Sequence, residues 1–211
     1  MRKLKSILVL IAITASILLG VVLSAQSQTV PTSPTDISPL LIGEQIPAIA
    51  LSDAKGKAVQ LKQLVALKPT VLIFYRGGWC PFCNKQLGEL QSIEGDLKKM
   101  GYQIIAISTD SPENLSKTIG KQKLGYTLLS DSKLVASKQF GIAYVGPKNY
   151  EKTLFEGSAG MNTEKLLPVP SVFILDTRGV IRFEYINPDF KQRISSGLMK
   201  AAAEAVAKDK V

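Results

Sequence analysis

The chain has 211 residues, of which 45% are hydrophobic, and a formal net charge of +9 at pH 7. It contains two cysteines and no histidine, which excludes Ser-His-Asp and Cys-His catalysis and histidine-ligated metals, and leaves too few ligands for a structural zinc site. The basic excess forms no run with interleaved aromatic residues, so nucleic acid is not expected as a partner.

The first 27 residues have the parts of an export signal. A basic stretch (residues 2–5) precedes an apolar run (residues 7–23), and Ala25-Gln26-Ser27 supplies small residues at the spacing of a signal-peptidase site. We expect cleavage after Ser27 or, as the alternative, retention as an N-terminal membrane anchor. Either outcome predicts an extracytoplasmic protein, periplasmic or secreted, with a membrane tether in the second case.

Residues 28–42 are rich in proline, serine and threonine, a composition that cannot bury a core and that predicts a tether. The folded domain is expected over residues 43–211. Strand and helix signals alternate there, which predicts an α/β fold with a central mixed sheet and helices on both faces.

The expected elements follow in chain order. Extended pieces around Ile49 and Val59 flank a turn at 53–56, and further strands are predicted at 71–75, 103–108, 126–129, 171–175 and 180–185, the last two joined by a turn at 176–179. Helices are predicted at 83–100, after Ser111, after Asp131 and from Asn187-Pro188-Asp189 onward. Residues 145–168 show no sustained period and are interpreted as a surface excursion, with a mobile flap near the site as the alternative.

The two cysteines lie between a predicted buried strand and the helix that follows it, in the motif Trp79-Cys80-Pro81-Phe82-Cys83. A helix N-terminus favours negative charge, so a thiol there ionises more readily than a free one. Pro81 suits the first turn because it has no N–H to lose, and its fixed backbone angle holds the sulfurs near disulfide geometry. Trp79 is expected to shield the site beside the sulfur, whereas Phe82 is expected to fill the core.

A fixed disulfide staple is the structural alternative to redox chemistry at this motif. Exported proteins keep disulfides, but closing so short a loop removes little entropy from the unfolded chain. The spacing therefore favours a pair that cycles between dithiol and disulfide.

The segments around the cysteines and around Val169-Pro170-Ser171 resemble the thioredoxin fold. More narrowly, they resemble the peroxiredoxin-like branch of the alkyl hydroperoxide reductase and thiol-specific antioxidant (AhpC/TSA) superfamily, over about residues 43–206. The resemblance implies that Pro170 is a cis-proline facing the sulfurs and that the backbone of Val169 pairs with an incoming peptide. It also implies an antioxidant-type enzyme without a cofactor, reduced by a thiol donor such as a thioredoxin-like protein.

The chain departs from the family pattern at three positions. Peroxiredoxins present Pro-x-x-x-Thr-x-x-Cys and a distant arginine, which together polarise the peroxide bond. Aligned with that pattern, Cys83 takes the peroxide-attacking position, but Arg76 stands in place of the proline, Cys80 in place of the threonine and Pro170 in place of the arginine. Arg76 is interpreted as a solvated turn residue. As the alternative, its guanidinium takes the place of the distant arginine that the family pattern has and this chain lacks.

Three functions remain open on the sequence. The preferred one is a thiol-disulfide oxidoreductase in which Cys80 attacks a substrate disulfide and Cys83 resolves the mixed disulfide. The second is a hydroperoxide reductase in which Cys83 becomes a sulfenic acid that Cys80 captures. The third is a non-catalytic redox-sensing or binding module.

Overall fold

The structure is a computed structural model that describes residues 29–209. The expected export signal, residues 1–27, lies outside the described residues. Within them, no helix combines the length and the apolar composition needed to cross a membrane.

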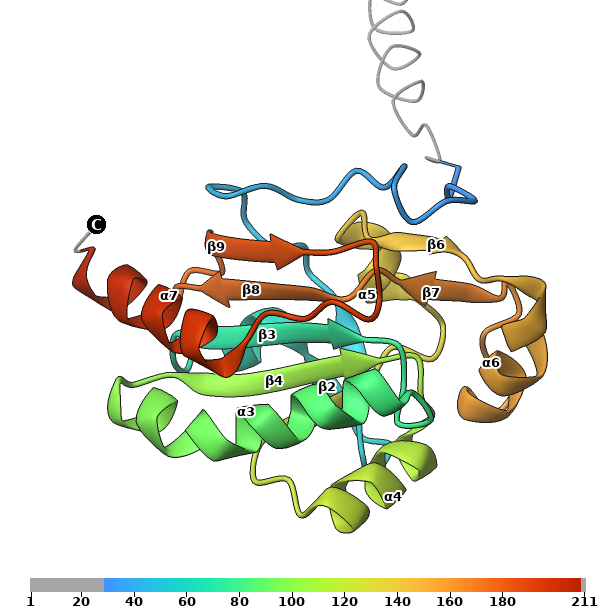
Figure 1. Ribbon diagram of the computed structural model, residues 1–211, viewed down its shortest axis with the longest axis horizontal. Coiled ribbons are helices and arrows are strands. Elements are labelled where there is room, and N and C mark those ends of the chain that lie inside the picture. The colour runs from blue at the N-terminus through green and yellow to red at the C-terminus, as the bar shows by residue number, and fades with distance from the viewer. Residues whose placement is uncertain (1–28, 210–211) are drawn as a thin grey trace, which may run out of the picture.

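A seven-stranded mixed sheet forms the centre of the molecule, in the order β2-β1-β5-β4-β3-β8-β9 (Figure 1). β3 pairs in parallel with β4, and β4 with β5, while β8 and β9 continue the sheet antiparallel on the other side. The strands are β1 Ala50–Asp53, β2 Ala58–Gln60, β3 Thr70–Tyr75, β4 Gln103–Ser108, β5 Thr127–Ser130, β8 Ser171–Leu175 and β9 Ile181–Ile186, and a separate two-stranded sheet pairs β6 Ala143–Val145 with β7 Leu166–Pro168. The predicted strands and both predicted turns are confirmed.

Helices cover both faces of the sheet, as the alternating pattern predicts. They are α2 Leu61–Val65, α3 Pro81–Lys99, α4 Pro112–Gln122, α5 Val135–Gln139, the 3-10 turn η1 Lys148–Tyr150, α6 Glu151–Gly157 and α7 Ser196–Lys208. Because side chains alternate along a strand, Val71, Ile73 and Tyr75 pack with α3, α4 and α7, whereas Leu72 and Phe74 pack with α2 and α5. Every residue of β3 is buried, so the strand that leads into the cysteine motif is fixed on both sides.

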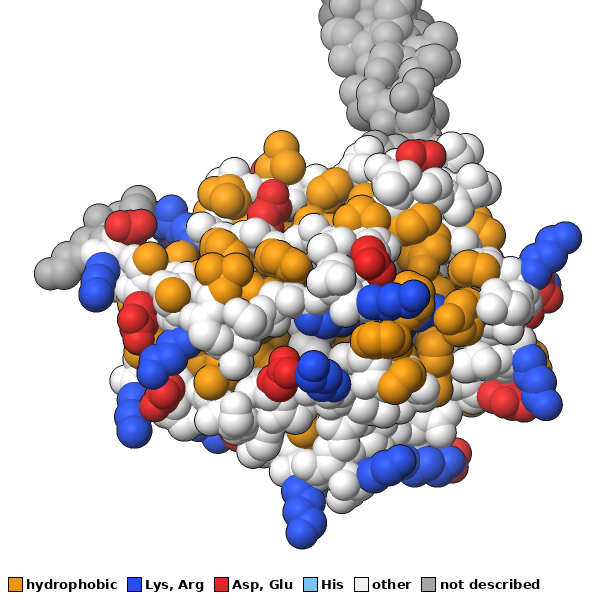
Figure 2. Space-filling view, in the orientation of Figure 1, with side chains coloured by type: hydrophobic (Ala, Val, Ile, Leu, Met, Phe, Trp, Pro, Cys, Tyr) orange, Lys and Arg blue, Asp and Glu red, His pale blue; other side chains and the backbone are white. Residues whose placement is uncertain are grey.

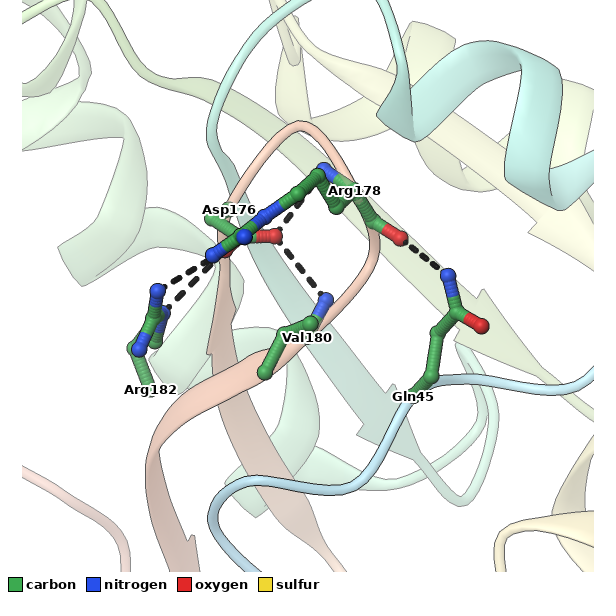
Figure 3. A network of polar contacts seen from close by, with 5 residues as sticks. All are labelled: Gln45, Asp176, Arg178, Val180 and Arg182. Atoms are coloured by element: carbon green, nitrogen blue, oxygen red, sulfur yellow. Dashed lines mark hydrogen bonds and ion pairs between the residues drawn. The ribbon is translucent and has the colours of Figure 1, made fainter. Parts of the chain in front are cut away.

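The β8–β9 turn is closed by one carboxylate (Figure 3). Asp176 accepts backbone hydrogen bonds from Arg178 and Val180, at 2.9 and 3.0 Å, and ion-pairs with the side chains of Arg178 and Arg182. Gly179 has a φ of +78°, a conformation that glycine adopts without strain. These contacts hold β9 in register with β8.

Residues 29–42 differ from the predicted tether. Backbone hydrogen bonds join Ser38 to Gly141 and Leu40 to Phe140, and Ile37 and Leu40 pack against the core cluster that contains Phe140. The prediction was wrong for this segment because its few apolar side chains find a surface that composition alone does not reveal. The ordered domain therefore begins before residue 42.

Residues 145–168 are an ordered part of the domain rather than a surface excursion. They form η1, α6 and β7, and the carbonyl of Gly157 accepts hydrogen bonds from the Ser111 backbone and the Asn114 side chain, at 2.8 and 2.9 Å. These bonds attach α6 to the start of α4 and bring η1 close to the end of β3.

The last helix begins at Ser196, not at Asn187 as predicted. Asn187 and Asp189 accept hydrogen bonds from backbone N–H groups two residues onward, so they form successive turns, and Ser195 caps the helix by accepting from Leu198 N at 3.2 Å. Asx turns compete with helix initiation. Residues 187–195, called the 187–195 loop below, are therefore irregular.

Basic side chains are dispersed around the margins of the face seen in Figure 2, with acidic ones among them. Many are paired along helices, as in Lys117–Glu113 and Lys85–Glu89. The net positive charge is therefore spread over the surface on this side of the molecule.

Candidate active site

Both cysteines lie at the start of α3, as the motif predicts. Cys80 is the N-cap residue and Pro81 opens the helix. The Cys80 backbone donates to Gly77 O at 3.1 Å, and its carbonyl accepts from Asn84 N at 3.0 Å. The cysteines thus follow the buried strand β3 and lie at a helix N-terminus, where partial positive charge stabilises a thiolate.

Both cysteines are free thiols, and both are buried. Cys80 is 1% exposed and Cys83 0%. The hydrogen bond from the Cys83 thiol lowers the pKa of Cys80 to about 6, against the effect of burial, and the positive charges of Arg76 and Arg193 act in the same direction. Burial raises the pKa of Cys83 well above the ordinary thiol value, and the hydrogen bond to Cys80 adds to this. The pair therefore holds one thiolate and one thiol near neutral pH, and it titrates as a unit.

Arg76 is buried, so its interpretation as a solvated turn residue was wrong. It is 1% exposed, and its guanidinium carbon lies 4.9 Å from the ring centroid of Trp79, 4.5 Å from that of Tyr150 and 4.1 Å from that of Phe190. We call these three rings the aromatic cage. Cation–π contacts of this kind are worth about 0.5–2 kcal/mol each, which offsets part of the cost of burying the charge.

A second arginine reaches the sulfurs from the 187–195 loop. Arg193 Nη2 donates to Cys83 Sγ at 3.4 Å, and Arg193 Nε is buried without a partner among the described residues. The sequence did not single out Arg193, because it lies 110 residues from Cys83 in a stretch read as helix. Two positive charges therefore flank the thiolate pair, one fixed by aromatic rings and one in contact with sulfur.

The two aromatic residues of the motif differ in their surroundings. Trp79, expected to shield the site, is partly buried, and its ring centroid lies 5.4 Å from that of Tyr150. Phe82, expected in the core, is 37% exposed and meets Phe190 edge-on at 5.7 Å. Trp79 is thus part of the aromatic cage, whereas Phe82 adjoins the cage and also faces solvent.

The AhpC/TSA family model matches residues 42–184. The chain belongs to the AhpC/TSA family. It is 31% identical to peroxiredoxin Bcp of Escherichia coli K12 over 155 residues, which is 74% of this chain and 90% of that protein. It is 32% identical to the chloroplastic peroxiredoxin Q of Suaeda salsa, over 69% of this chain and 59% of that one.

Solved structures of this family share the fold. Peroxidoxin BcpB of Mycobacterium tuberculosis superposes with a TM-score of 0.64 at 22% identity, covering 81% of this chain and 98% of that one. Reduced Prx3 of Vibrio vulnificus, in complex with hydrogen peroxide, gives 0.66 at 19% identity, covering 78% and 99%. The predicted thioredoxin-like architecture is confirmed, and the AhpC/TSA relatives make the chain a thiol-based oxidoreductase.

Two implications of the family resemblance are contradicted by the structure. No peptide bond between residues 29 and 209 is cis, so Pro170 is trans. The backbone of Val169 is occupied, because its N–H donates to Ile142 O and its carbonyl accepts from Ser171 Oγ, both at 2.8 Å. Both backbone groups that were expected to bind a peptide are therefore paired within the fold, and Val169 itself is fully buried.

A buried carboxyl group lies close to the cysteine motif. Asp110 follows β4, and its Oδ2 accepts from Gly78 N at 2.7 Å and from Ser108 Oγ at 3.1 Å. Burial raises the pKa of Asp110 to about 6. Together with Trp79, Asp110 lines a cavity of about 470 Å³ between α4 and α6. The sequence does carry a signal for Asp110, because this residue comes just after β4, the strand that pairs with β3.

Proposed function

We propose that this protein is a thiol-dependent hydroperoxide reductase, in which Cys83 attacks the peroxide and Cys80 resolves. The observation that carries the proposal is the burial of both sulfurs beside two guanidinium groups. A hydroperoxide is small enough to reach such a sulfur, whereas a protein disulfide must present its own sulfur in line with the attacking one. The peroxiredoxin relatives support the same reaction.

The first step uses the hydrogen bond between the sulfurs. Transfer of the shared proton from Cys83 to Cys80 leaves a thiolate on Cys83, the sulfur with the higher pKa and therefore the greater intrinsic nucleophilicity. That thiolate attacks the terminal peroxide oxygen. The O–O bond breaks, the leaving alkoxide or hydroxide takes the proton from the Cys80 thiol, and Cys83 is oxidised to a sulfenic acid.

The second step closes the bridge. The Cys80 thiolate attacks the sulfenic sulfur, an S–S bond forms, and hydroxide leaves and is protonated by solvent. The peroxide has then received two electrons, and the cysteines are joined in a disulfide. A dithiol reductant of the thioredoxin-like class reopens the bridge by exchange, which requires a local movement of the chain because both cysteines are buried.

Thiol-disulfide exchange, the function preferred on the sequence, has less support than peroxide reduction. Its peptide-binding edge depended on Val169, whose backbone groups are both paired. A non-catalytic sensing module has no observation of its own in its favour among the described residues.

The test follows the loss of both thiols in the reduced full-length chain. The oxidants are hydrogen peroxide, an alkyl hydroperoxide and a model protein disulfide, and the variants are Cys80→Ser and Cys83→Ser. We expect both peroxides to act faster than the protein disulfide, Cys83→Ser to abolish peroxide consumption, and Cys80→Ser to retain one turnover. Faster reaction with the protein disulfide, lost in Cys80→Ser, would restore the exchange function.

We further propose that the protein works outside the cytoplasm. The support is the order of basic, apolar and small residues over positions 1–27. Fractionation of cells that express the full chain, followed by N-terminal sequencing, tests this and distinguishes cleavage after Ser27 from an anchor. Recovery of the intact chain in the cytosolic fraction would contradict the proposal.

A further inference from the structure

The two arginines beside the cysteines make different contacts. Arg193 Nη2 contacts Cys83 Sγ at 3.4 Å. The guanidinium of Arg76 is held within the aromatic cage, 4.1–4.9 Å from the three ring centroids. Of the two guanidinium groups, that of Arg193 is therefore the one that donates to a sulfur in the described part of the chain, and this sulfur belongs to Cys83.

Resting on the hydroperoxide reductase function proposed above, we propose that Arg193 selects Cys83 as the attacking sulfur by drawing the thiolate charge of the pair away from Cys80. The charge moves with one proton along the hydrogen bond between the sulfurs. A guanidinium in contact with one of them stabilises the form that has its charge there, because a charge-assisted hydrogen bond is stronger than a neutral one. Arg193 is then a catalytic residue that the cysteine motif does not contain.

The surroundings of Arg193 leave it free for this role. Within residues 29–209 its guanidinium makes no salt bridge, and its Nε is buried without a partner. Its only other polar contact is a long one, 3.5 Å, to the carbonyl of the preceding Gln192. The contact with Cys83 is thus the one that joins this side chain to another element of the fold.

The 187–195 loop places Arg193 by local bonds that do not involve the sulfurs. Asn187 N donates to Pro170 O at 3.3 Å, Asp189 N to Asn187 Oδ1 at 3.0 Å, and Ser195 caps α7. Phe190 of the same loop covers Arg76. One short segment therefore carries both the lid of the aromatic cage and the guanidinium that contacts Cys83.

The experiment measures which sulfur reacts, without any peroxide. The reduced full-length chain is treated at neutral pH with limiting iodoacetamide, and mass spectrometry gives the ratio of alkylation at Cys83 to that at Cys80. Arg193→Gln should lower this ratio by about tenfold or more, the size expected for loss of a hydrogen bond to a charged group. Arg193→Lys, which keeps the charge, should lie between the parent and Arg193→Gln.

Lys191→Gln is the matched control, because it removes one positive charge from the same loop at an exposed position. It should leave the ratio unchanged. An unchanged ratio in Arg193→Gln, or an equal fall in Lys191→Gln, would overturn the assignment. Because the readout is alkylation, it stands apart from the peroxidase test: a slow reaction of the parent with peroxide would refute the proposed function and leave the selection of the sulfur measurable.

Discussion

Removing the Cys83 thiol should make Cys80 a weaker acid by a predictable amount. The pKa of Cys80 is lowered from 9.0 to about 6, and the hydrogen bond from Cys83 is the largest cause. A hydrogen bond to a charged group contributes about 1.5–3 kcal/mol, which corresponds to about one to two pKa units. In Cys83→Ala we therefore expect the Cys80 pKa to rise to about 7–8.

The assay is the pH dependence of thiolate absorbance in the ultraviolet, checked by the rate of alkylation at Cys80. Cys83→Ser is the control, since its hydroxyl keeps a donor at the same place and should preserve most of the shift. The reasoning fails if Cys83→Ala still titrates near pH 6, because the arginines and the helix N-terminus would then account for the acidity without the second sulfur.

Three further predictions concern stability. Burial raises the pKa of Asp110 to about 6, above its value in the unfolded chain, so the folded state binds this proton more tightly. The protein should therefore lose up to about 3 kcal/mol of stability as pH rises from about 4 to 6. Asp110→Asn should reduce the pH dependence of the urea midpoint across that range, and an undiminished dependence would contradict this. Tyr150→Ala removes a ring 4.5 Å from the Arg76 guanidinium and should cost about 1–3 kcal/mol in urea unfolding, whereas Tyr150→Phe, which keeps the ring, should cost little. Ser195→Ala removes the cap of α7 and should cost about 1 kcal/mol; a loss below a few tenths would show that the cap does not hold the helix start.

The parts of the site that depend on neighbours in sequence were predictable. The run from Val71 to Tyr75 is apolar throughout, which indicates a strand buried on both faces, and Pro81 marks the first turn of a helix. Together they placed Cys80 and Cys83 at a helix N-terminus, where the structure has them.

The parts that depend on contacts across the fold were not predictable. An arginine after a strand is usually solvated, and nothing near Arg76 in the sequence indicates that Tyr150 and Phe190 close over it. Asn187-Pro188-Asp189 matches the signal of a helix start, but its side chains form turns instead, and this keeps Arg193 in a loop that reaches the sulfurs.

Pro170 shows why a resemblance does not transfer residue by residue. A proline before a buried strand matched the motif of thiol-exchange proteins, yet the preceding Val169 pairs with Ile142 in this chain. Ile142 and Ser171, whose contacts composition did not reveal, occupy the backbone groups that exchange would need.

The products of a single exposure to peroxide test the central claim most directly. The reduced full-length chain and its Cys80→Ser variant are each mixed with a stoichiometric amount of hydrogen peroxide, quenched with a thiol-blocking reagent and analysed by peptide mass spectrometry. We expect a disulfide between Cys80 and Cys83 in the parent and a sulfenic acid on Cys83 in the variant. A variant whose Cys83 stays reduced, together with a Cys83→Ser variant that is oxidised at Cys80, would contradict it.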